Sequence, residues 1–469
     1  MTDSPLSPAP LAAPQAAPHA DSVATYAEAE QALLSRWPEH KLDPSLERIA
    51  AFTELLGDPQ AAYPVIHLTG TNGKTTTARM IDTLIRALGL RTGRFTSPHV
   101  ESMTERISID GEPLNEEQFL GAFNEIAPYT HLVDRSSDHP LSFFETVVGM
   151  AYSTFADAPV DVAIVEVGMG GSWDATNVAD GKVAVIGPIS VDHANYLGDR
   201  PEDIAIEKAG IIKQGATVII AEQSERVAEV LLERAVAMGA TVLREGLDFG
   251  IVARLPAVGG QMLHLQGLRG EYDEVFLPLY GAHQAQNAAL ALVAVEAFSG
   301  GEPLDAGLVC EAFAAVTSPG RLEVIRRSPT IVLDAAHNPH GAAATADALQ
   351  DSFTFSPLIG VVAVMADKDY EGVLEAFEPV LAEIICTQSS TSRSMPAEDL
   401  AEVARGIFGV DRVHVARRLD DAIEQAATLA EAGGVYGEAI GSGAVLITGS
   451  VITVGEARAM LRPRTRVNE

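Results

Sequence analysis

The sequence predicts an α/β fold with mostly parallel sheets, and three observations support this prediction. Short runs of β-branched and other apolar residues recur along the chain, as in buried strands. Many of the stretches between them carry apolar residues at helical spacing. With 469 residues, the chain is also long enough for two or three domains. Strands that alternate with helices in this way are typical of parallel sheets covered by helices.

The predicted strands are short. They lie at residues 65–68, 160–167, 183–189, 217–220, 331–333, 358–365, 384–386, 413–415 and 445–447. After the first strand, apolar residues at helical spacing lie on one face of a predicted helix, which ends at Gly89. Residues 225–280 depart from the alternation with short segments and turns, so we expect antiparallel strands there.

A domain boundary is predicted near Ser318-Pro319-Gly320, where a helical stretch ends in a turn and a new series of strands and helices begins. The first 25 residues are rich in Ala and Pro and are expected to form a disordered tail. The predicted division is therefore a tail at 1–25, a larger domain at 26–318 and a smaller domain at 319–469.

Composition excludes several classes of function. The chain has 32 Lys and Arg against 64 Asp and Glu, a net charge of -32, which argues against a nucleic-acid partner. Its two cysteines, Cys310 and Cys386, are too few for a disulfide framework and indicate a reducing compartment. The N-terminal residues lack the features of a signal peptide, and the uncharged run at 439–455 is shorter than the ~20 apolar residues of a membrane span. We therefore expect a soluble cytoplasmic protein without a membrane partner.

A glycine-rich segment, Thr-Gly-Thr-Asn-Gly-Lys-Thr-Thr at 69–76, lies between the first predicted strand and its helix. Strand, glycine loop and helix N-terminus together bind phosphate through backbone N–H groups and the helix dipole. Lys74 supplies a charge for the β and γ phosphates, and the Thr75 hydroxyl is placed for Mg²⁺. The general phosphate-loop pattern has Gly where this chain has Leu68. The alternative is an ordinary tight turn before a helix.

A second group of polar residues follows two later strands. Glu166 stands at the end of one, and Asp192 and His193 follow the next. Ligands bind beyond the carboxyl ends of strands in open α/β sheets, and Mg²⁺ prefers oxygen ligands, so Glu166 is the better candidate ligand. The alternatives are a loop charge at Glu166 and a capping or core histidine at His193. Lys208, about two turns into a helix that begins at Pro201, is by itself an ordinary surface charge.

Taken together, these segments resemble the folylpolyglutamate synthase and dihydrofolate synthase family, within the wider group of Mur ligases. The wider group has a loop of the form T-G-T-N-G-K-T, which accounts for Leu68. The match runs in order over roughly residues 40 to 460. The segments that indicate the folate branch are Phe95-Thr96-Ser97-Pro98-His99, Glu105-Arg106-Ile107, Phe143-Phe144-Glu145, 166–171, 207–213, 281–284 with Asn287, 319–323, 334–339 and Thr448-Gly449-Ser450.

The resemblance implies a large N-terminal ATPase domain of Mur-ligase type, a smaller Rossmann-like C-terminal domain, and an active site in the cleft between them. It implies formation of an amide between a pteroate or folate carboxylate and the amino group of L-glutamate. ATP phosphorylates the carboxylate, and the amine attacks the acyl phosphate with release of ADP and phosphate. Mg²⁺ at two sites is implied, with K⁺ as a further cation. We expect small-molecule substrates only, and a monomer.

The resemblance also assigns roles to single residues. Lys74, Glu166, His193 and Lys208 are the expected catalytic residues. The expected ATP contacts are Thr71, Asn72, Gly73, Lys74, Thr75, Asn287, Arg321 and Asp334. The expected Mg²⁺ ligands are Ser97, Glu166 and His193, with Thr75 from the loop pattern. The pterin or folate is expected at Asp43, Pro44, Ser45, Leu46, Phe144, Glu145, Trp173, Asp174 and Ala175, and the incoming glutamate at His337 and Ser450. Trp173 stands where Leu is more usual in the family.

Lys208 is carbamylated in the family, so the resemblance implies the same modification here. Carbamylation converts an ammonium into a carboxylate-like group that helps to bind a second cation.

The segment 43–48 resembles the one that contacts dihydropteroate in members with both synthase activities, so we predict a bifunctional enzyme. The alternative within the family is a folylpolyglutamate synthase only. A cell-wall Mur ligase would need an additional UDP-binding domain before the phosphate loop, and only 69 residues precede Gly70. A nucleotide-binding regulatory protein without catalysis is the alternative from another class.

Overall fold

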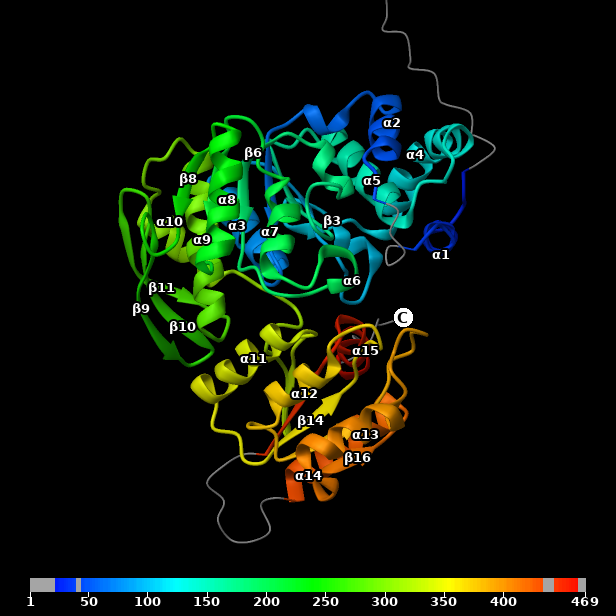
Figure 1. Ribbon diagram of the computed structural model, residues 1–469, viewed down its shortest axis with the longest axis vertical. Helices are drawn as coiled ribbons and strands as arrows, with labels where there is room; N and C mark the ends of the chain where they lie inside the picture. Colours follow the sequence, from blue (N-terminus) through cyan, green and yellow to red (C-terminus); the bar gives the residue numbers. More distant parts are fainter. Residues whose placement is uncertain (1–21, 39–43, 433–442, 463–469) are drawn as a thin grey trace, which may run out of the picture.

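The computed structural model describes residues 22–38, 44–432 and 443–462, and it forms two lobes (Figure 1). The N-terminal lobe runs from α1 to α10, in blue to green, and the C-terminal lobe runs from β12 to α15, in yellow to red. Most of the predicted tail, residues 1–21, lies outside the described residues, as does part of the uncharged run at 439–455. Among the described residues, no helix is long and apolar enough to cross a membrane.

The N-terminal lobe is built on an eight-stranded sheet in the order β4-β3-β2-β5-β1-β6-β7-β8. The strands from β2 to β8 in this order are parallel to their neighbours, and β3 and β4 add an antiparallel edge. β1 and β5 are buried at every position, as expected for parallel strands with helices on both faces. The strands are β1 (Val65–Thr69), β2 (Thr92–Phe95), β3 (Ile107–Ile109), β4 (Glu112–Pro113), β5 (Val162–Glu166), β6 (Gly181–Ile186), β7 (Thr217–Ile220) and β8 (Thr241–Arg244).

Helices cover both faces of this sheet. One face packs against α3 (Lys74–Ala87), α9 (Ala282–Phe298) and α10 (Ala306–Ala314). The other face packs against α1 (Tyr26–Leu34), α2 (Glu47–Leu55), α4 (Glu116–Ser136), α5 (Phe143–Asp157), α7 (Pro201–Ala209) and α8 (Glu225–Ala237). The short helical segments are η1 (Pro59–Ala61), η2 (Met103–Arg106), η3 (Ala175–Val178) and α6 (Ala194–Leu197).

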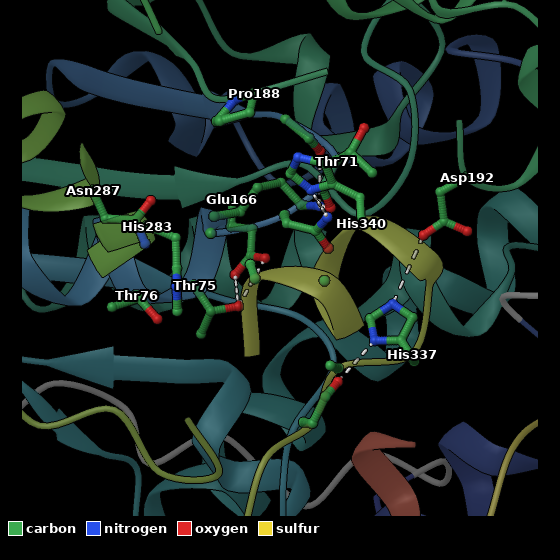
Figure 2. Close-up of a pocket in the computed structure, with 18 of the residues that line it drawn as sticks. Thr71, Thr75, Thr76, Glu166, Pro188, Asp192, His283, Asn287, His337 and His340 are labelled. Atoms are coloured by element: carbon green, nitrogen blue, oxygen red, sulfur yellow. Dashed lines mark hydrogen bonds and ion pairs between the residues drawn. The ribbon is translucent and has the colours of Figure 1, made fainter. Parts of the chain in front are cut away.

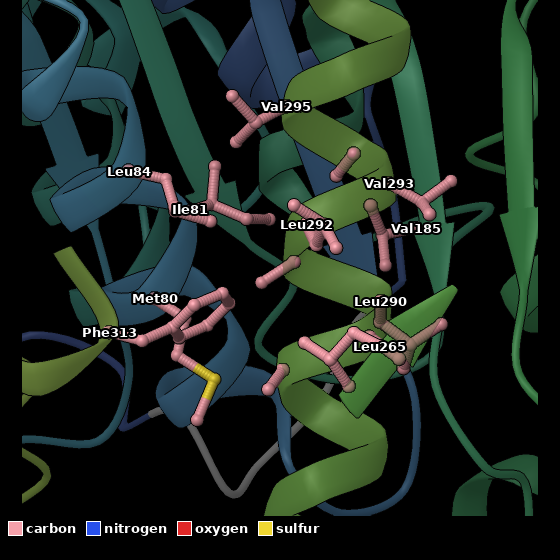
Figure 3. Close-up of a cluster of buried hydrophobic side chains, with 14 of the residues drawn as sticks. Met80, Ile81, Leu84, Val185, Leu265, Leu290, Leu292, Val293, Val295 and Phe313 are labelled. Atoms are coloured by element: carbon pink, nitrogen blue, oxygen red, sulfur yellow. The ribbon is translucent and has the colours of Figure 1, made fainter. Parts of the chain in front are cut away.

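A small antiparallel sheet extends the first hydrophobic core. Its strands, in the order β11-β10-β9, are β9 (Gly250–Ala257), β10 (Gly260–Gln266) and β11 (Glu271–Leu277). In Figure 3, Leu265 of β10 lies beside Leu290 of α9, and Ile81 and Leu84 of α3 face the same helix. The antiparallel segment predicted at 225–280 is thus confirmed only from Gly250 onward, because α8 and β8 continue the parallel alternation.

The C-terminal lobe has a six-stranded sheet in the order β12-β13-β17-β14-β15-β16, antiparallel only between β12 and β13. Its strands are β12 (Glu323–Arg327), β13 (Thr330–Leu333), β14 (Leu358–Val362), β15 (Glu383–Cys386), β16 (Val413–Val415) and β17 (Ala444–Thr448). One face packs against α11 (Pro339–Ser352), α12 (Tyr370–Phe377) and α13 (Ala397–Phe408), and the other against α14 (Leu419–Ala432) and α15 (Val451–Leu461), with η4 (Val410–Arg412) before β16. The predicted α/β class with mostly parallel sheets is confirmed in both lobes.

Candidate functional site

The glycine loop joins β1 to α3, as predicted. Gly73 caps α3 in a left-handed conformation, with φ of 82°, which glycine adopts without strain. A Cβ on Gly73 would also overlap the side chain of Asn287 at the start of α9. On its other side the loop is fixed by Thr71, whose backbone N–H donates to Pro188 O at 2.9 Å and whose hydroxyl donates to Ser190 O at 2.9 Å. The loop is therefore held in one conformation between β6 and α9.

Two lysines converge on this loop. Lys74 Nζ donates to Gly70 O at 3.0 Å and to Thr71 O at 3.3 Å, and Lys208 Nζ donates to Gly70 O at 2.9 Å. Lys208, on α7, is only 4% exposed, so it is not a surface charge. Burial, reinforced by the charge of Lys74, lowers the pKa of Lys208 to about 7. Its amine is therefore substantially neutral near neutral pH, which makes it nucleophilic.

Glu166 lies at the carboxyl end of β5, directly beside the start of α3. The Thr75 hydroxyl is 2.9 Å from both carboxylate oxygens, and the backbone N–H of Ser97 donates to Oε2 at 3.2 Å. Glu166 is 1% exposed, and burial raises its pKa to about 7. Within the described residues there is no preformed cluster of three or more His, Cys, Asp or Glu side chains suited to a metal ion.

The oxygen donors around Glu166 nevertheless fit Mg²⁺. Mg²⁺ binds proteins through one or two carboxylates and completes its shell with water and substrate phosphates. A carboxylate and a threonine hydroxyl beside a phosphate-type loop provide such a set. Burial raises the pKa of Glu166 despite the attraction of Lys74 and Arg321, so a bound cation would further stabilise its charged form.

Asp192, His193 and Lys368 form a buried contact between the lobes. Lys368, which follows β14 in the C-terminal lobe, approaches Asp192 Oδ1 to 2.5 Å and His193 Nε2 to 3.2 Å. Burial opposes ionisation of Asp192, yet the Lys368 ammonium holds the pKa of this carboxyl below its usual range. Burial lowers the pKa of His193 to about 3, so its imidazole is neutral and its Nε2 accepts from Lys368. Any metal bound at Nε2 must displace Lys368.

Glu166 and His193 follow different strands of the large sheet. β5 and β6, which precede them, are not neighbours: both pair with β1, which lies between them. Glu166, Ser97, Thr75 and His193 still line one cavity, because all of them lie at the carboxyl edge of this sheet.

That cavity, the phosphate-loop cavity, holds ≈ 190 Å³ and reaches into the C-terminal lobe. In Figure 2, Glu166 faces Thr75, with His283 and Asn287 on one side and Asp192 and His337 on the other. Every residue predicted to contact ATP lines it: Thr71, Asn72, Gly73, Lys74, Thr75, Asn287, Arg321 and Asp334. Asp334 accepts bonds from Leu322 N, Ala336 N and Thr345 Oγ1 at 2.8–3.0 Å, and these contacts fix the wall that the C-terminal lobe contributes.

A second cavity of ≈ 600 Å³, the interlobe cavity, adjoins the first. The predicted pterin residues that line it are Pro44, Ser45, Phe144, Glu145, Trp173, Asp174 and Ala175, and the predicted glutamate residues His337 and Ser450 line it as well. The two cavities share Ser97, His193, His337 and Val451 in their walls. A ligand in one cavity can therefore meet a ligand in the other at these residues.

Two of the predicted pterin residues, Glu145 and Asp174, form hydrogen bonds within the protein. Two others, Leu46 and Asp43, are not found in the wall of the interlobe cavity. Glu145 caps α5 and pairs with Arg48 at 3.1 Å, and Asp174 accepts from Met169 N and Thr176 N at 2.9 Å. Leu46 does not line the interlobe cavity, because its side chain packs against the hydrophobic core of the N-terminal lobe. Asp43 lies outside the described residues.

Several cavity residues were not predicted. Lys368 and Arg393 line the interlobe cavity. Asn338 is in the wall of neither cavity, but it donates to two residues of the phosphate-loop cavity, Asp192 Oδ2 and Asn72 Oδ1, both at 3.0 Å. Asn338 lies in the segment after β13. The rule that ligands bind beyond the carboxyl ends of strands, which indicated Glu166, therefore indicates Asn338 as well. Lys368 and Arg393 become candidates only once the two lobes are placed together.

Comparisons with known proteins agree with this geometry. The model of the Mur ligase middle domain matches residues 130–295, and that of the Mur ligase glutamate ligase domain matches 320–451. The chain is 49% identical, over 94% of its length and 95% of the relative's, to the dihydrofolate synthase/folylpolyglutamate synthase of Mycobacterium tuberculosis. It is 32% identical to the Bacillus subtilis protein of the same name, over 77% of this chain and 85% of that one.

Solved structures give the same result. The Mycobacterium tuberculosis folylpolyglutamate synthase complexed with ADP has a TM-score of 0.90 at 49% identity, covering 93% of this chain and 98% of that one. Escherichia coli FolC in complex with DHPP and ADP has a TM-score of 0.81 at 28% identity, covering 93% and 97%. The chain belongs to the dihydrofolate synthase/folylpolyglutamate synthase family of the Mur ligases.

Proposed function

We propose that this ATP-dependent ligase is bifunctional: it adds L-glutamate to dihydropteroate and also to reduced folates that already carry glutamate. The observation that carries the proposal is the junction of the two cavities at Ser97, His193 and His337. ATP in the smaller cavity can present its γ-phosphate to a carboxylate held in the larger one. The larger cavity is open enough for a pterin with its aminobenzoyl group at more than one depth.

In the proposed mechanism, the substrate carboxylate attacks the γ-phosphorus, and ADP leaves. The acyl phosphate is then attacked by the neutral amine of glutamate, and phosphate leaves as the amide forms. The chain's contribution is positioning and charge neutralisation. Lys74 is proposed to hold the β and γ phosphates, and the neutral His193 and His337 lie where the two substrates meet. The incoming glutamate is proposed to bind near His337 and Ser450 at the interlobe cavity.

Mg²⁺ is proposed as the resident cation, held by Glu166, Thr75 and Ser97, with His193 as a further ligand once Lys368 is displaced. When bound, it neutralises charge on the phosphates. Lys208 is proposed to be carbamylated for a second cation; its burial at 4% exposure and its lowered pKa favour the neutral amine that reacts with CO₂. K⁺, the monomeric state, the cytoplasmic location and the division at 26–318 and 319–469 remain predictions.

The test measures phosphate release from the purified protein with ATP, Mg²⁺ and L-glutamate. We expect turnover with 7,8-dihydropteroate and also with tetrahydrofolate, and none when glutamate is omitted. The Lys74→Ala variant serves as the control for contaminating phosphatase. Turnover with the folate alone would make the protein a folylpolyglutamate synthase only and refute bifunctionality. Turnover with neither acid would refute the ligase activity itself.

A further inference from the structure

Residues 97–102, here called the Ser97 loop, connect β2 to η2 and are fixed to the N-terminal lobe at both ends. At the start, the backbone N–H of Ser97 donates to Glu166 Oε2 at 3.2 Å. At the end, the backbone N–H groups of Val100, Glu101 and Ser102 all donate to the carboxylate of Glu105 at 2.9–3.0 Å. The position of Ser97 beside Glu166 therefore depends on the conformation of the whole loop.

The middle of the Ser97 loop is packed into the other lobe. The Val100 side chain lies against the hydrophobic cluster that includes Val454 and Ala457 of α15. A Cβ on Gly455, in the middle of the same helix, would overlap the carbonyl oxygen of Val100. Glycine inside a helix costs roughly 1 kcal/mol relative to alanine. The close approach of the loop backbone explains why this buried position holds Gly455 and not a residue with a Cβ.

Arg458, one turn further along α15, adds a charged contact. Its side chain is 9% exposed; Nε lies 2.8 Å from Glu323 Oε2 in the C-terminal lobe, and Nη1 pairs with Glu101 of the loop. Arg462 Nη1 approaches Glu101 Oε2 at 3.3 Å. One planar guanidinium thus holds two carboxylates from different lobes, which a lysine ammonium does not do with the same geometry.

The N-terminal end of α15 reaches the junction of the two cavities. Val451, its first residue, lines both cavities together with Ser97 and Pro98. The same helix therefore contacts the loop at Val100 and Glu101, and it begins at a residue that lines the same two cavities as Ser97.

We propose that α15 positions the Ser97 loop for metal binding, with Gly455 and Arg458 as positioning residues, so that the metal site is complete only when the C-terminal lobe is docked. The proposal rests on the proposed role of Ser97 as a metal ligand. Neither residue lines the phosphate-loop cavity or the interlobe cavity. They act through the loop, and loss of partners that orient a metal ligand typically weakens metal binding about 10- to 100-fold.

The first test compares Gly455→Ala with Gly406→Ala. Gly406 lies in α13, where an added Cβ meets open space, so both substitutions raise helix propensity and only the first displaces the loop. Mn²⁺ binding to the protein saturated with ADP is measured by electron paramagnetic resonance, and amide hydrogen exchange is followed at residues 97–102. We expect Gly455→Ala to bind Mn²⁺ at least about tenfold more weakly and to exchange faster in the loop. Gly406→Ala is expected to match the unmodified protein.

The second test uses Arg458→Met and Arg458→Lys. Arg458→Met should weaken Mn²⁺ binding, and Arg458→Lys should weaken it less. The affinity for ADP, measured in EDTA, should stay unchanged in both variants. The proposal is overturned if folded Gly455→Ala and Arg458→Met bind Mn²⁺ with unaltered affinity. It is also overturned if the variants lose affinity for Mn²⁺ and for metal-free ADP by the same factor. If Gly455→Ala fails to fold, the Arg458 pair decides. These measurements involve neither folate nor glutamate, so a wrong substrate assignment leaves their outcome intact.

Discussion

Replacing Glu166 by Gln is expected to stabilise the metal-free protein while abolishing its activity. Burial raises the pKa of this carboxyl from 4.5 to about 7. The folded protein therefore binds more protons than the unfolded chain between these values, and its stability falls as the pH rises through this window. A shift of roughly 2.5 units corresponds to about 3 kcal/mol lost above pH 7. Gln carries no charge and keeps an oxygen for the bonds from Thr75 and Ser97, so the variant avoids this loss.

The assay is thermal unfolding in EDTA at pH 5 and pH 8, with turnover measured in parallel. At pH 8 the unfolding temperature of Glu166→Gln should rise by roughly 5 °C, and at pH 5 the stability difference should fall below about 1 kcal/mol. Turnover should drop by at least about 100-fold. Glu117→Gln, at an exposed glutamate of α4, is the control and should change neither quantity. A Glu166→Gln protein that is less stable at pH 8 would refute the reasoning.

Three further predictions follow from the site. Lys74→Ala should lower turnover about 10²- to 10³-fold with an unchanged unfolding temperature, and activity within tenfold of the original contradicts the role of the loop. Lys208→Ala should lose activity and regain part of it with a short added carboxylate; no rescue, together with an unmodified lysine in electron density, contradicts carbamylation. In a double-mutant cycle of Asp192→Asn and Lys368→Met, unfolding free energies should reveal a coupling above about 1 kcal/mol, whereas additive effects contradict a stabilising ion pair.

The apolar strands were the most predictable part of the fold. The predicted strands at 217–220 and 413–415 match β7 and β16, and in β7 the Val-Ile-Ile run is buried, as the apolar pattern predicted. The strand predicted at 183–189 ends at Ile186, since Pro188 has no N–H to continue the ladder. β2 was missed because its buried Arg94 pairs with Asp82 of α3, and a polar residue inside the core conceals the strand pattern.

The site was predictable where function depends on local sequence. The glycine loop and Glu166 are recognisable from the residues that adjoin them. Strand order is not local: nothing in the sequence places β1 between β5 and β6. The Asp192–Lys368 contact joins residues from different lobes, so it depends on how the two sheets are oriented, and single-sequence patterns carry no information about that.

The pairing of Glu101 with Arg458 has a consequence for synthesis of the chain. The two residues are 357 positions apart, and α15 is the last helix of the described structure. At ribosomal rates of 5–20 residues per second, roughly half a minute separates their emergence. During that interval the phosphate loop can already fold, while Val100 has no apolar partner in α15 and is exposed to solvent. A nascent chain is therefore expected to acquire nucleotide binding before metal binding, and ribosome-stalled chains that end before residue 451 should show this order.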